Sequence, residues 1–168
     1  MSIQTNTEGA PDQLALRQAF SLFPTGVVAV CSVVDETPVG IAVNSFTSVS
    51  LDPPLVGICV AKSSATWPVL ADSNRLGLSV LGSHQGKLCR SLASRNTDRF
   101  LEAPWRATDA GAVVMEGAAL WLECEVRSTF DGGDHVVVLL EVVKSDLFPD
   151  VTPLVFHQSK FRELQIAE

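Results

Sequence analysis

The feature that most constrains the fold is a series of short apolar runs, each bounded by a cluster of Asp, Pro, Gly or Ser. These runs cover residues 27–34, 39–44, 55–60, 76–81, 119–129 and 135–143. Short runs bounded by turn residues are typical of strands, and this spacing favours an antiparallel barrel or sandwich. A chain of 168 residues has the usual size of one domain. We therefore expect a single mainly β domain over residues 12–168, preceded by a flexible polar segment, residues 1–11.

The run near residue 120 gives the clearest strand. Its apolar members alternate with Trp121 and with charged residues, which predicts one buried face and one wet face. They are Leu120, Leu122, Cys124 and Val126. Residues 131–134, Asp-Gly-Gly-Asp, tolerate positive φ and predict a hairpin turn. That turn places His135 at the start of the return strand.

Short helices are expected to flank the strands. Helical spacing of apolar residues predicts an opening helix with Asp12 as its N-cap, ended by Pro24. Two further helical inserts are predicted, one with Thr66 as N-cap and one that begins near Ser83.

Charge and composition exclude several classes of protein. Twelve Lys and Arg stand against 19 Asp and Glu, a net charge of −7 that disfavours nucleic acid as a partner. No run approaches the roughly 18 apolar residues of a membrane span, and the polar N-terminus does not resemble a secretion signal. We therefore expect a cytoplasmic protein with no membrane partner. The four cysteines lack any C-x-x-C pair and the three histidines lie far apart, which predicts reduced, buried thiols and no metal site.

The common nucleotide-binding and hydrolase signatures are absent from the sequence. Residues 41–56 stand out instead, because an apolar strand turns into a polar stretch before Asp52-Pro53-Pro54. Gly40, Ala42 and Asn44 share one face of that strand, and small side chains there would let a flat ring approach the backbone. An equally favoured interpretation is that the hydroxyls satisfy turn backbone groups and edge-strand positions.

A second polar cluster follows the strand that ends at Val60. It consists of Lys62, Ser63, Ser64 and Thr66. Hydroxyls, a lysine and helix N–H groups at one point suit a phosphate. On local chemistry alone, plain capping of the helix by Thr66 with Lys62 in solvent is the favoured interpretation.

Four strings occur in order along the chain: GIAVNSFTSVSLDPPLV, SSATWP, DRF and GDH. Together they resemble the short-chain flavin reductases over roughly residues 20–164, and the first string, similar to T-A-N-S-F-x-S-V-S-x-x-P-P-L, is the specific part. The resemblance implies an antiparallel Greek-key split β-barrel, the FMN-binding split barrel, with a few short flanking helices. It also implies a homodimer that reduces FMN or FAD with NADH or NADPH and supplies reduced flavin to a partner monooxygenase.

The resemblance also assigns site residues. It implies that His135 of GDH contacts the nicotinamide dinucleotide and carries the catalytic role. The cofactor-binding residues that it implies are Pro24, Thr25, Ala42, Val43, Asn44, Ser45, Ser48, Val49, Ser50, Lys62, Ser63, Ser64, Thr66, Gln85, Phe156 and Phe161. Ala42 and Val43 stand where the family often has Thr-Ala, so one hydroxyl beside the flavin ring is lost.

Alternatives stay open at this point. Without the resemblance, His135 is interpreted as a surface residue at a hairpin end, and Asp98 and Arg99 of DRF as an exposed ion pair. A non-catalytic flavin-binding module would use the same phosphate residues, and a small barrel for another apolar ligand would fit the β pattern. The acidic balance favours NADH over NADPH, whose extra phosphate usually needs local Arg or Lys.

Overall fold

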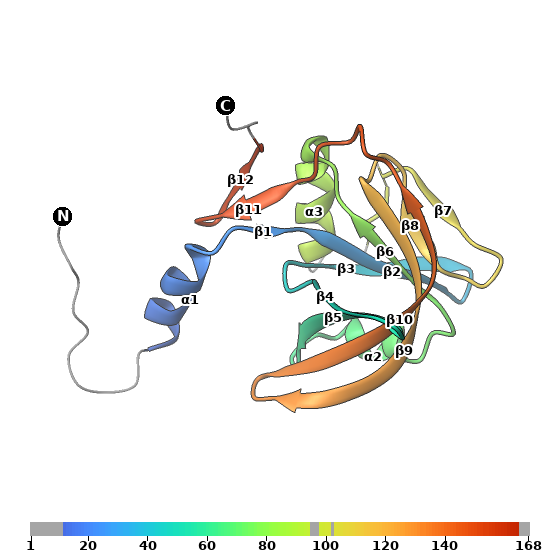
Figure 1. The fold of residues 1–168 in the computed structure, drawn as a ribbon, viewed down its shortest axis with the longest axis horizontal. Helices are drawn as coiled ribbons and strands as arrows, with labels where there is room; N and C mark the ends of the chain where they lie inside the picture. The colour runs from blue at the N-terminus through green and yellow to red at the C-terminus, as the bar shows by residue number, and fades with distance from the viewer. Residues whose placement is uncertain (1–11, 95–97, 102, 165–168) are drawn as a thin grey trace.

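The computed structural model describes residues 12–94, 98–101 and 103–164, so the predicted flexible segment 1–11 lies outside the described residues. A seven-stranded sheet forms the body of the molecule (Figure 1). Its spatial order is β3 (Thr37–Val43), β2 (Val28–Val34), β6 (Leu76–Val80), β9 (Leu120–Gly132), β10 (His135–Leu147), β5 (Pro54–Ala61) and β4 (Thr47–Leu51). Every pairing in it is antiparallel. The predicted mainly β, antiparallel fold is confirmed.

Smaller elements surround this sheet. One small sheet joins β1 (Thr25–Gly26), β11 (Val155–His157) and β12 (Lys160–Arg162), and another joins β7 (Trp105–Ala107) and β8 (Val113–Met115). The helices are α1 (Gln13–Ser21), α2 (Trp67–Ala71) and α3 (Gly86–Ala93), with a 3-10 turn, η1 (Ser83–Gln85), before α3. The Asp12 carboxylate accepts from Ala15 N at 2.7 Å, which confirms the predicted N-cap of α1.

The predicted hairpin between residues 120 and 143 is present and longer than expected. His135 pairs with Gly132, and Gly133 between them has φ of 80°. A positive φ is accessible to glycine without strain, so the Gly-Gly pair sets the register of β9 and β10. His135 therefore does open the return strand.

A side chain at the end of β3 links two strands that lie far apart in the sheet order. The Ser45 hydroxyl, just beyond β3, donates to Cys59 O at 2.9 Å and accepts from Cys59 N at 2.8 Å. Cys59 lies in β5, near the opposite end of the strand order. Ser45 thus ties the curled sheet together at one point and leaves β3 and β5 to diverge beyond it.

The core has two main parts, one on each side of β2. Val28 and Val30 belong to the cluster inside the curled sheet, whereas Ala29 and Cys31 belong to the cluster under α3. β2 is buried on both faces, which agrees with its apolar sequence, interrupted only by Ser32. Gly77 allows the close approach of β8, since a Cβ there would lie 2.0 Å from Val113 O.

The expectation of a wet face on β9 is wrong at Trp121, which is only 9% exposed. Its Nε1 donates to Met115 O at 2.6 Å, and its ring packs edge to face on Phe148 at 4.5 Å. The Arg106 guanidinium covers the same ring at 4.4 Å. The small β7–β8 sheet therefore supplies a partner for a side chain that local alternation assigns to solvent.

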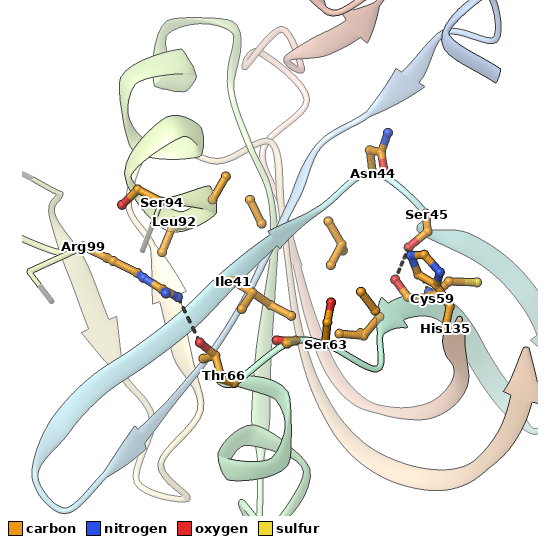
Figure 2. A pocket seen from close by; sticks show the side chains of 17 residues that line it. Ile41, Asn44, Ser45, Cys59, Ser63, Thr66, Leu92, Ser94, Arg99 and His135 are labelled. Carbon is orange, nitrogen blue, oxygen red and sulfur yellow. Dashed lines mark hydrogen bonds between the residues drawn. The ribbon is translucent and has the colours of Figure 1, made fainter. Parts of the chain in front are cut away.

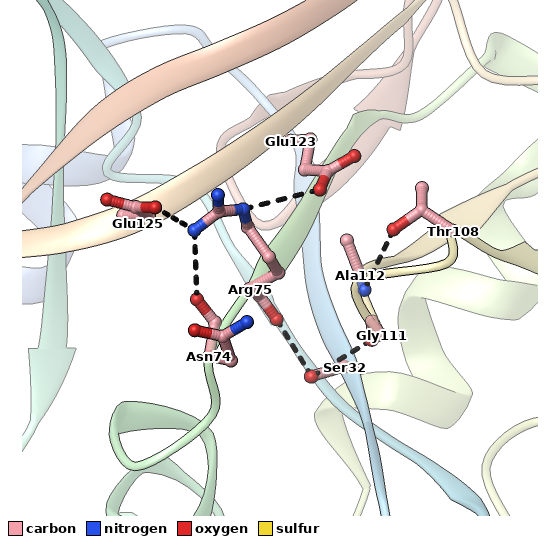
Figure 3. Close-up of polar contacts among 8 residues, drawn as sticks. All are labelled: Ser32, Asn74, Arg75, Thr108, Gly111, Ala112, Glu123 and Glu125. Carbon is pink, nitrogen blue, oxygen red and sulfur yellow. Dashed lines mark hydrogen bonds and ion pairs between the residues drawn. The ribbon is translucent and has the colours of Figure 1, made fainter.

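A polar network links several strands at the end of the main sheet away from the Ser45–Cys59 contact (Figure 3). The buried Ser32 hydroxyl lies 2.8 Å from Arg75 O and 3.1 Å from Gly111 O. Arg75 pairs through Nη1 with Glu125 and through Nε with Glu123 at 3.4 Å. These contacts join β2, the start of β6, β9 and the loop before β8 into one cross-linked end.

All four cysteines are free thiols, as predicted; Cys31 and Cys124 are buried, and Cys59 and Cys89 are half-buried. Burial raises the pKa of Cys31 far above its usual value and that of Cys124 to about 12, so both stay protonated at neutral pH. None of the helices in the described part of the chain is long and apolar enough to cross a membrane. Among the same residues there is no cluster of three or more His, Cys, Asp or Glu side chains that could hold a metal ion.

Candidate active-site cleft

An open cleft of about 770 Å³ lies where β3 and β5 diverge beyond the Ser45 contact (Figure 2). Its walls are the end of β3 with Asn44 and Ser45, the end of β5, residues 63–66, the C-terminal end of α3, Arg99 and His135. The two segments that the sequence singles out, 41–45 and 63–66, meet across this space. Chain segments more than 15 residues apart therefore form one site.

About half of the predicted site residues line the cleft. They are Ala42, Val43, Asn44, Ser45, Ser63, Ser64, Thr66 and His135. The others do not line it: Pro24, Thr25, Ser48, Val49, Ser50, Lys62, Gln85, Phe156 and Phe161.

The small-residue face of β3 is covered by protein at Gly40. A Cβ on Gly40 would lie 2.4 Å from Cys31 Sγ and 2.9 Å from Phe100 Cζ. Ala42 packs against the same cluster as Phe100. Glycine is thus needed at residue 40 because Cys31 and Phe100 leave no room for a side chain, and the open part of the cleft lies farther along, from Ile41 to Asn44. Asn44 is exposed at the rim, where its side chain points away from Ser63 and Thr66 (Figure 2).

The second half of the polar stretch is strand β4, which agrees with the interpretation of its hydroxyls as edge-strand positions. Thr47 pairs with Gly57 and Ser48 with Val56, and a register shift lies between Ser48 and Ser50. As the last strand in the sheet order, β4 pairs with β5 alone. Its polar side chains are typical of an edge strand, which explains why strand periodicity was not evident.

Residues 63–66 carry the hydroxyls of the cleft. The Ser64 hydroxyl accepts from Trp67 N at 3.2 Å and so caps α2. Thr66 makes no side-chain cap, which corrects the expectation, and its Oγ1 instead accepts from Arg99 Nη1 at 3.1 Å. Since α2 has only five residues, its dipole adds little, and the hydroxyls and the guanidinium dominate the polarity of this end.

Lys62 turns to the outside of the molecule. Its Nζ pairs with Asp131 Oδ2 at 2.6 Å, and its backbone N–H donates to Asp134 O at 2.9 Å. The hydrogen bond from Lys62 is the main cause that lowers the pKa of the exposed Asp131 carboxyl. Lys62 therefore fastens the end of β5 to the β9–β10 turn, and its charge is directed away from the cleft.

His135 stands at the rim beside Ser45 and Cys59 (Figure 2). Its Nδ1 lies 2.7 Å from Asp134 Oδ1, and this hydrogen bond is the main cause that lowers the pKa of Asp134. The ionised Asp134 carboxylate accepts a hydrogen bond from Nδ1–H, so Nε2 is the ring nitrogen that Asp134 does not engage. Asp134 thus orients the imidazole.

The other predicted residues gather in a second place, around the small β1–β11–β12 sheet and the start of α3. Thr25 pairs with Phe156, whose ring centroid lies 5.8 Å from that of Phe161. Gln85 is buried, accepts from Gly82 N at 2.8 Å and donates to Glu116 O at 2.8 Å. Among the described residues, the Thr25 hydroxyl is buried without a hydrogen-bond partner. Pro24 directly precedes this small sheet and is exposed.

Several lining residues escaped the sequence reasoning. They are Ile41, Cys59, Val60, Ala61, Ala65, Leu92, Ala93, Ser94 and Arg99. Most are small or apolar and carry no chemical signal. Arg99 was the exception, since the DRF string marked it, but a local interpretation as an ion pair hid its contacts with residues far away in the chain.

The residues present fit a phosphorylated planar ligand. The cleft joins an apolar wall, Ile41 to Val43, to a group of hydroxyls beside a guanidinium, with an imidazole at the opposite rim. Among the described lining residues no Asp or Glu occurs. The site can bind and orient such a ligand, but it offers no carboxylate for acid–base chemistry. The fold is thus mainly β and antiparallel, and its cleft suits a phosphorylated planar ligand.

Residues 20–165 match the flavin reductase like domain family, and the chain belongs to that family. It is 33% identical over 156 residues to the reductase subunit HsaB of a flavin-dependent monooxygenase from Mycobacterium tuberculosis, covering 92% of this chain and 83% of that protein. It is 35% identical to the FMN reductase (NADH) SmoA of Agrobacterium fabrum, covering 91% and 87%. The structure of the Streptomyces globisporus NADH:FAD oxidoreductase SgcE6, in complex with NAD and FAD fragments, superposes with a TM-score of 0.87 at 37% identity, covering 92% of this chain and 93% of that one.

Proposed function

We propose that the protein is an NADH-dependent flavin reductase that reduces FMN or FAD and supplies the reduced flavin to a partner monooxygenase. The observation that carries the proposal is the cleft, which joins a hydroxyl-rich end at Ser63, Ser64 and Thr66 to His135 at the other rim. The names of the relatives agree with it, since they include a monooxygenase reductase subunit and an NADH-dependent FMN reductase.

The proposed flavin site consists of the cleft-lining residues. Val43 and Asn44 border the ring, and the hydroxyls of residues 63–66 bind the phosphate end. Ser45 contributes through its backbone, because its hydroxyl already makes two bonds to Cys59.

The chemistry is a hydride transfer from the nicotinamide C4 to the flavin N5. The protein's part is to hold two rings in contact and to exclude water, and positioning of this kind lowers a two-reactant barrier by up to roughly 7–11 kcal/mol. No strong acid or base is required, which agrees with the absence of carboxylates among the described lining residues. The role proposed for His135 is to orient the nicotinamide dinucleotide through Nε2.

A steady-state assay that crosses FMN and FAD with NADH and NADPH tests the proposal. We expect flavin-dependent oxidation of NADH, with NADPH the poorer donor. Absence of flavin-dependent oxidation of either donor by the folded protein would disprove the function.

His135→Ala tests the role of the histidine. We expect kcat/KM for NADH to fall by about ten-fold or more, because a hydrogen bond made in the complex is lost, while the Kd for flavin stays within two-fold. The matched control is His157→Ala, which changes a histidine of β11 outside the cleft lining. An equal loss of flavin affinity in His135→Ala would place the histidine at the flavin instead.

We further propose a homodimer in the cytoplasm, without nucleic-acid or membrane partners. Four free thiols are typical of a reducing compartment, and the net charge of −7 repels polyanions. Apolar side chains on and just after α1 support self-association, since Phe20 and Phe23 are 71% and 75% exposed. Light scattering coupled to size-exclusion chromatography measures the oligomeric state.

A further inference from the structure

Arg99 belongs to the DRF string, to which the proposed function gives no role. Its Nη1 donates to Gly40 O on β3 at 2.8 Å and to Thr66 Oγ1 at 3.1 Å. These two bonds fix the guanidinium beside the hydroxyl-rich end of the cleft (Figure 2). The sequence assigns the phosphate-binding cation to Lys62, yet Lys62 is paired with Asp131 and does not line the cleft.

The hydroxyls nearest Arg99 suit the same ligand. Thr66 accepts from Arg99, so its own proton is available as a donor, and Ser63 stands on the same rim (Figure 2). A guanidinium flanked by hydroxyls matches the several acceptor oxygens of a phosphate, and charge-assisted bonds of this kind are roughly twice as strong as neutral ones.

Arg99 also lines a second cavity, of about 370 Å³, between α3 and residues 98, 101, 103 and 104. Leu88, Leu101 and Pro104 give this cavity an apolar wall, and most of its other lining residues are polar or charged: His84, Gln85, Lys87, Ser91, Asp98 and Glu116. Its volume is typical of small-molecule sites. Because Arg99 lines both cavities, it can bind a phosphate that lies between them. That phosphate can link the two halves of one ligand or lie where two ligands meet.

We infer that Arg99 binds the phosphate end of the flavin nucleotide, and that the second cavity receives the adenylate half of a dinucleotide. The inference rests on the proposed function and adds a specificity determinant to it. FMN would fill the cleft alone, whereas FAD or NADH has an adenylate to place in the second cavity. Apolar walls suit the base, and Lys87 and Arg99 suit its phosphate.

The first test is flavin binding, measured by quenching of flavin fluorescence with riboflavin, FMN and FAD. In Arg99→Gln we expect the Kd for FMN and for FAD to rise about ten-fold or more, while the Kd for riboflavin, which has no phosphate, stays within two-fold. Arg99→Lys keeps the charge and should retain part of the preference for FMN over riboflavin. The matched control is Arg127→Gln, since Arg127 is an exposed arginine that pairs with Glu141 at 3.6 Å.

The outcomes of this test separate the two proposals. If the wild type binds none of the three flavins, the proposed function fails. If the wild type binds and reduces flavin but Arg99→Gln and Arg99→Lys leave the FMN to riboflavin ratio unchanged, only the inference about Arg99 fails. A phosphate-selective loss in Lys62→Gln in place of Arg99→Gln would also overturn it.

The second test fills the second cavity with Ser91→Trp. A rise of about ten-fold in the Kd for FAD, with the Kd for FMN unchanged, assigns the cavity to the adenylate of FAD. A similar rise in KM for NADH with FMN as acceptor, with the Kd for FAD unchanged, assigns it to the adenylate of NADH. If neither value changes in the folded variant, the cavity binds no adenylate and that part of the inference is wrong.

Discussion

The hydroxyl-rich stretch of residues 41–51 has two halves with different fates. Its first half, 41–45, lines the cleft, and its second half forms β4, an edge strand outside the cleft lining. Both halves carry hydroxyls, but Ser45 makes two bonds to a strand distant in the sheet order, whereas Ser48 is exposed. Two serines with the same local chemistry therefore differ in role, because the curl of the sheet brings only Ser45 close to β5.

A similar contrast separates two arginines. Arg75 at one end of the barrel pairs with Glu123 and Glu125 and joins strands, whereas Arg99 bonds to a carbonyl and a hydroxyl at the cleft. The Arg75 contacts belong to the folded framework (Figure 3). The Arg99 contacts hold a cation at the rim of a solvent-filled space.

The largest expected effect separates Ser45 from Ser48. Ser45→Ala removes both bonds to Cys59 and leaves a half-buried N–H and C=O without their partner, so we expect the free energy of unfolding to fall by about 2–3 kcal/mol. Flavin affinity should fall as well, because this contact defines the edge of the cleft. Ser48→Ala, the matched control, should stay within about 0.5 kcal/mol. Denaturant unfolding and flavin titration measure both, and equal losses in the two variants would remove the distinction between the halves.

Much of the fold could be predicted because its main strands are long or strongly patterned. The six apolar runs all fall in strands of the main sheet, and the Gly-Gly turn sets the β9–β10 hairpin. Strands β7, β8, β11 and β12 have three residues each, too few for a period to be recognised. The bounds of β4 were not predicted, because an edge strand tolerates polar side chains on both faces and left only the general alternative of edge-strand positions.

The candidate site could be predicted only in part, because some of its residues have local signals and others meet only in the folded chain. The strand end at Asn44 and the loop at Thr66 have local polar signals. Arg99 meets Gly40 across 59 positions of sequence, and Ser45 meets Cys59 through the curl of the whole sheet. Contacts of this kind follow from tertiary closure. The family resemblance assigned Lys62 to the phosphate, whereas the local interpretation, which left Lys62 in solvent, agrees with its exposed pair with Asp131.

A smaller effect sharpens the contrast between the cleft hydroxyls and those of β4. Thr66→Val keeps the shape of the side chain and removes its oxygen, so we expect the Kd for FMN to rise about five- to ten-fold while that for riboflavin is unchanged. Thr47→Val makes the same change on exposed β4 and should alter neither value. Fluorescence titration of the two variants side by side measures the difference. If Thr47→Val weakens FMN binding as much as Thr66→Val does, β4 contributes to the site and the two halves are not distinct.

The smallest expected effect concerns the boundary of the cleft just after β5. There Ser63 lines the cleft, whereas Lys62 faces outward. Hydrogen bonding to Lys62 lowers the pKa of Asp131 from its usual 3.8, so the ionised carboxylate stabilises the folded state above that pH. This stabilisation is lost as the pH falls through the lowered pKa. Asp131→Asn should therefore be slightly less stable than wild type at pH 7, and the two unfolding curves should converge in acid. The effect is small because both side chains are exposed.

Flavin binding by the same variant decides on which side of the boundary Lys62 lies. Asp131→Asn removes the carboxylate that holds the Lys62 ammonium outside, so a lysine able to reach the phosphate would tighten FMN binding once released. We expect the Kd for FMN to stay within two-fold, measured at pH 7 where Asp131 of the wild type is ionised. Tighter binding by Asp131→Asn would show that the lysine competes for the phosphate and that the cleft extends past Ser63. An unchanged Kd leaves Arg99, which already bonds to Thr66 inside the cleft, as the cation that the phosphate meets.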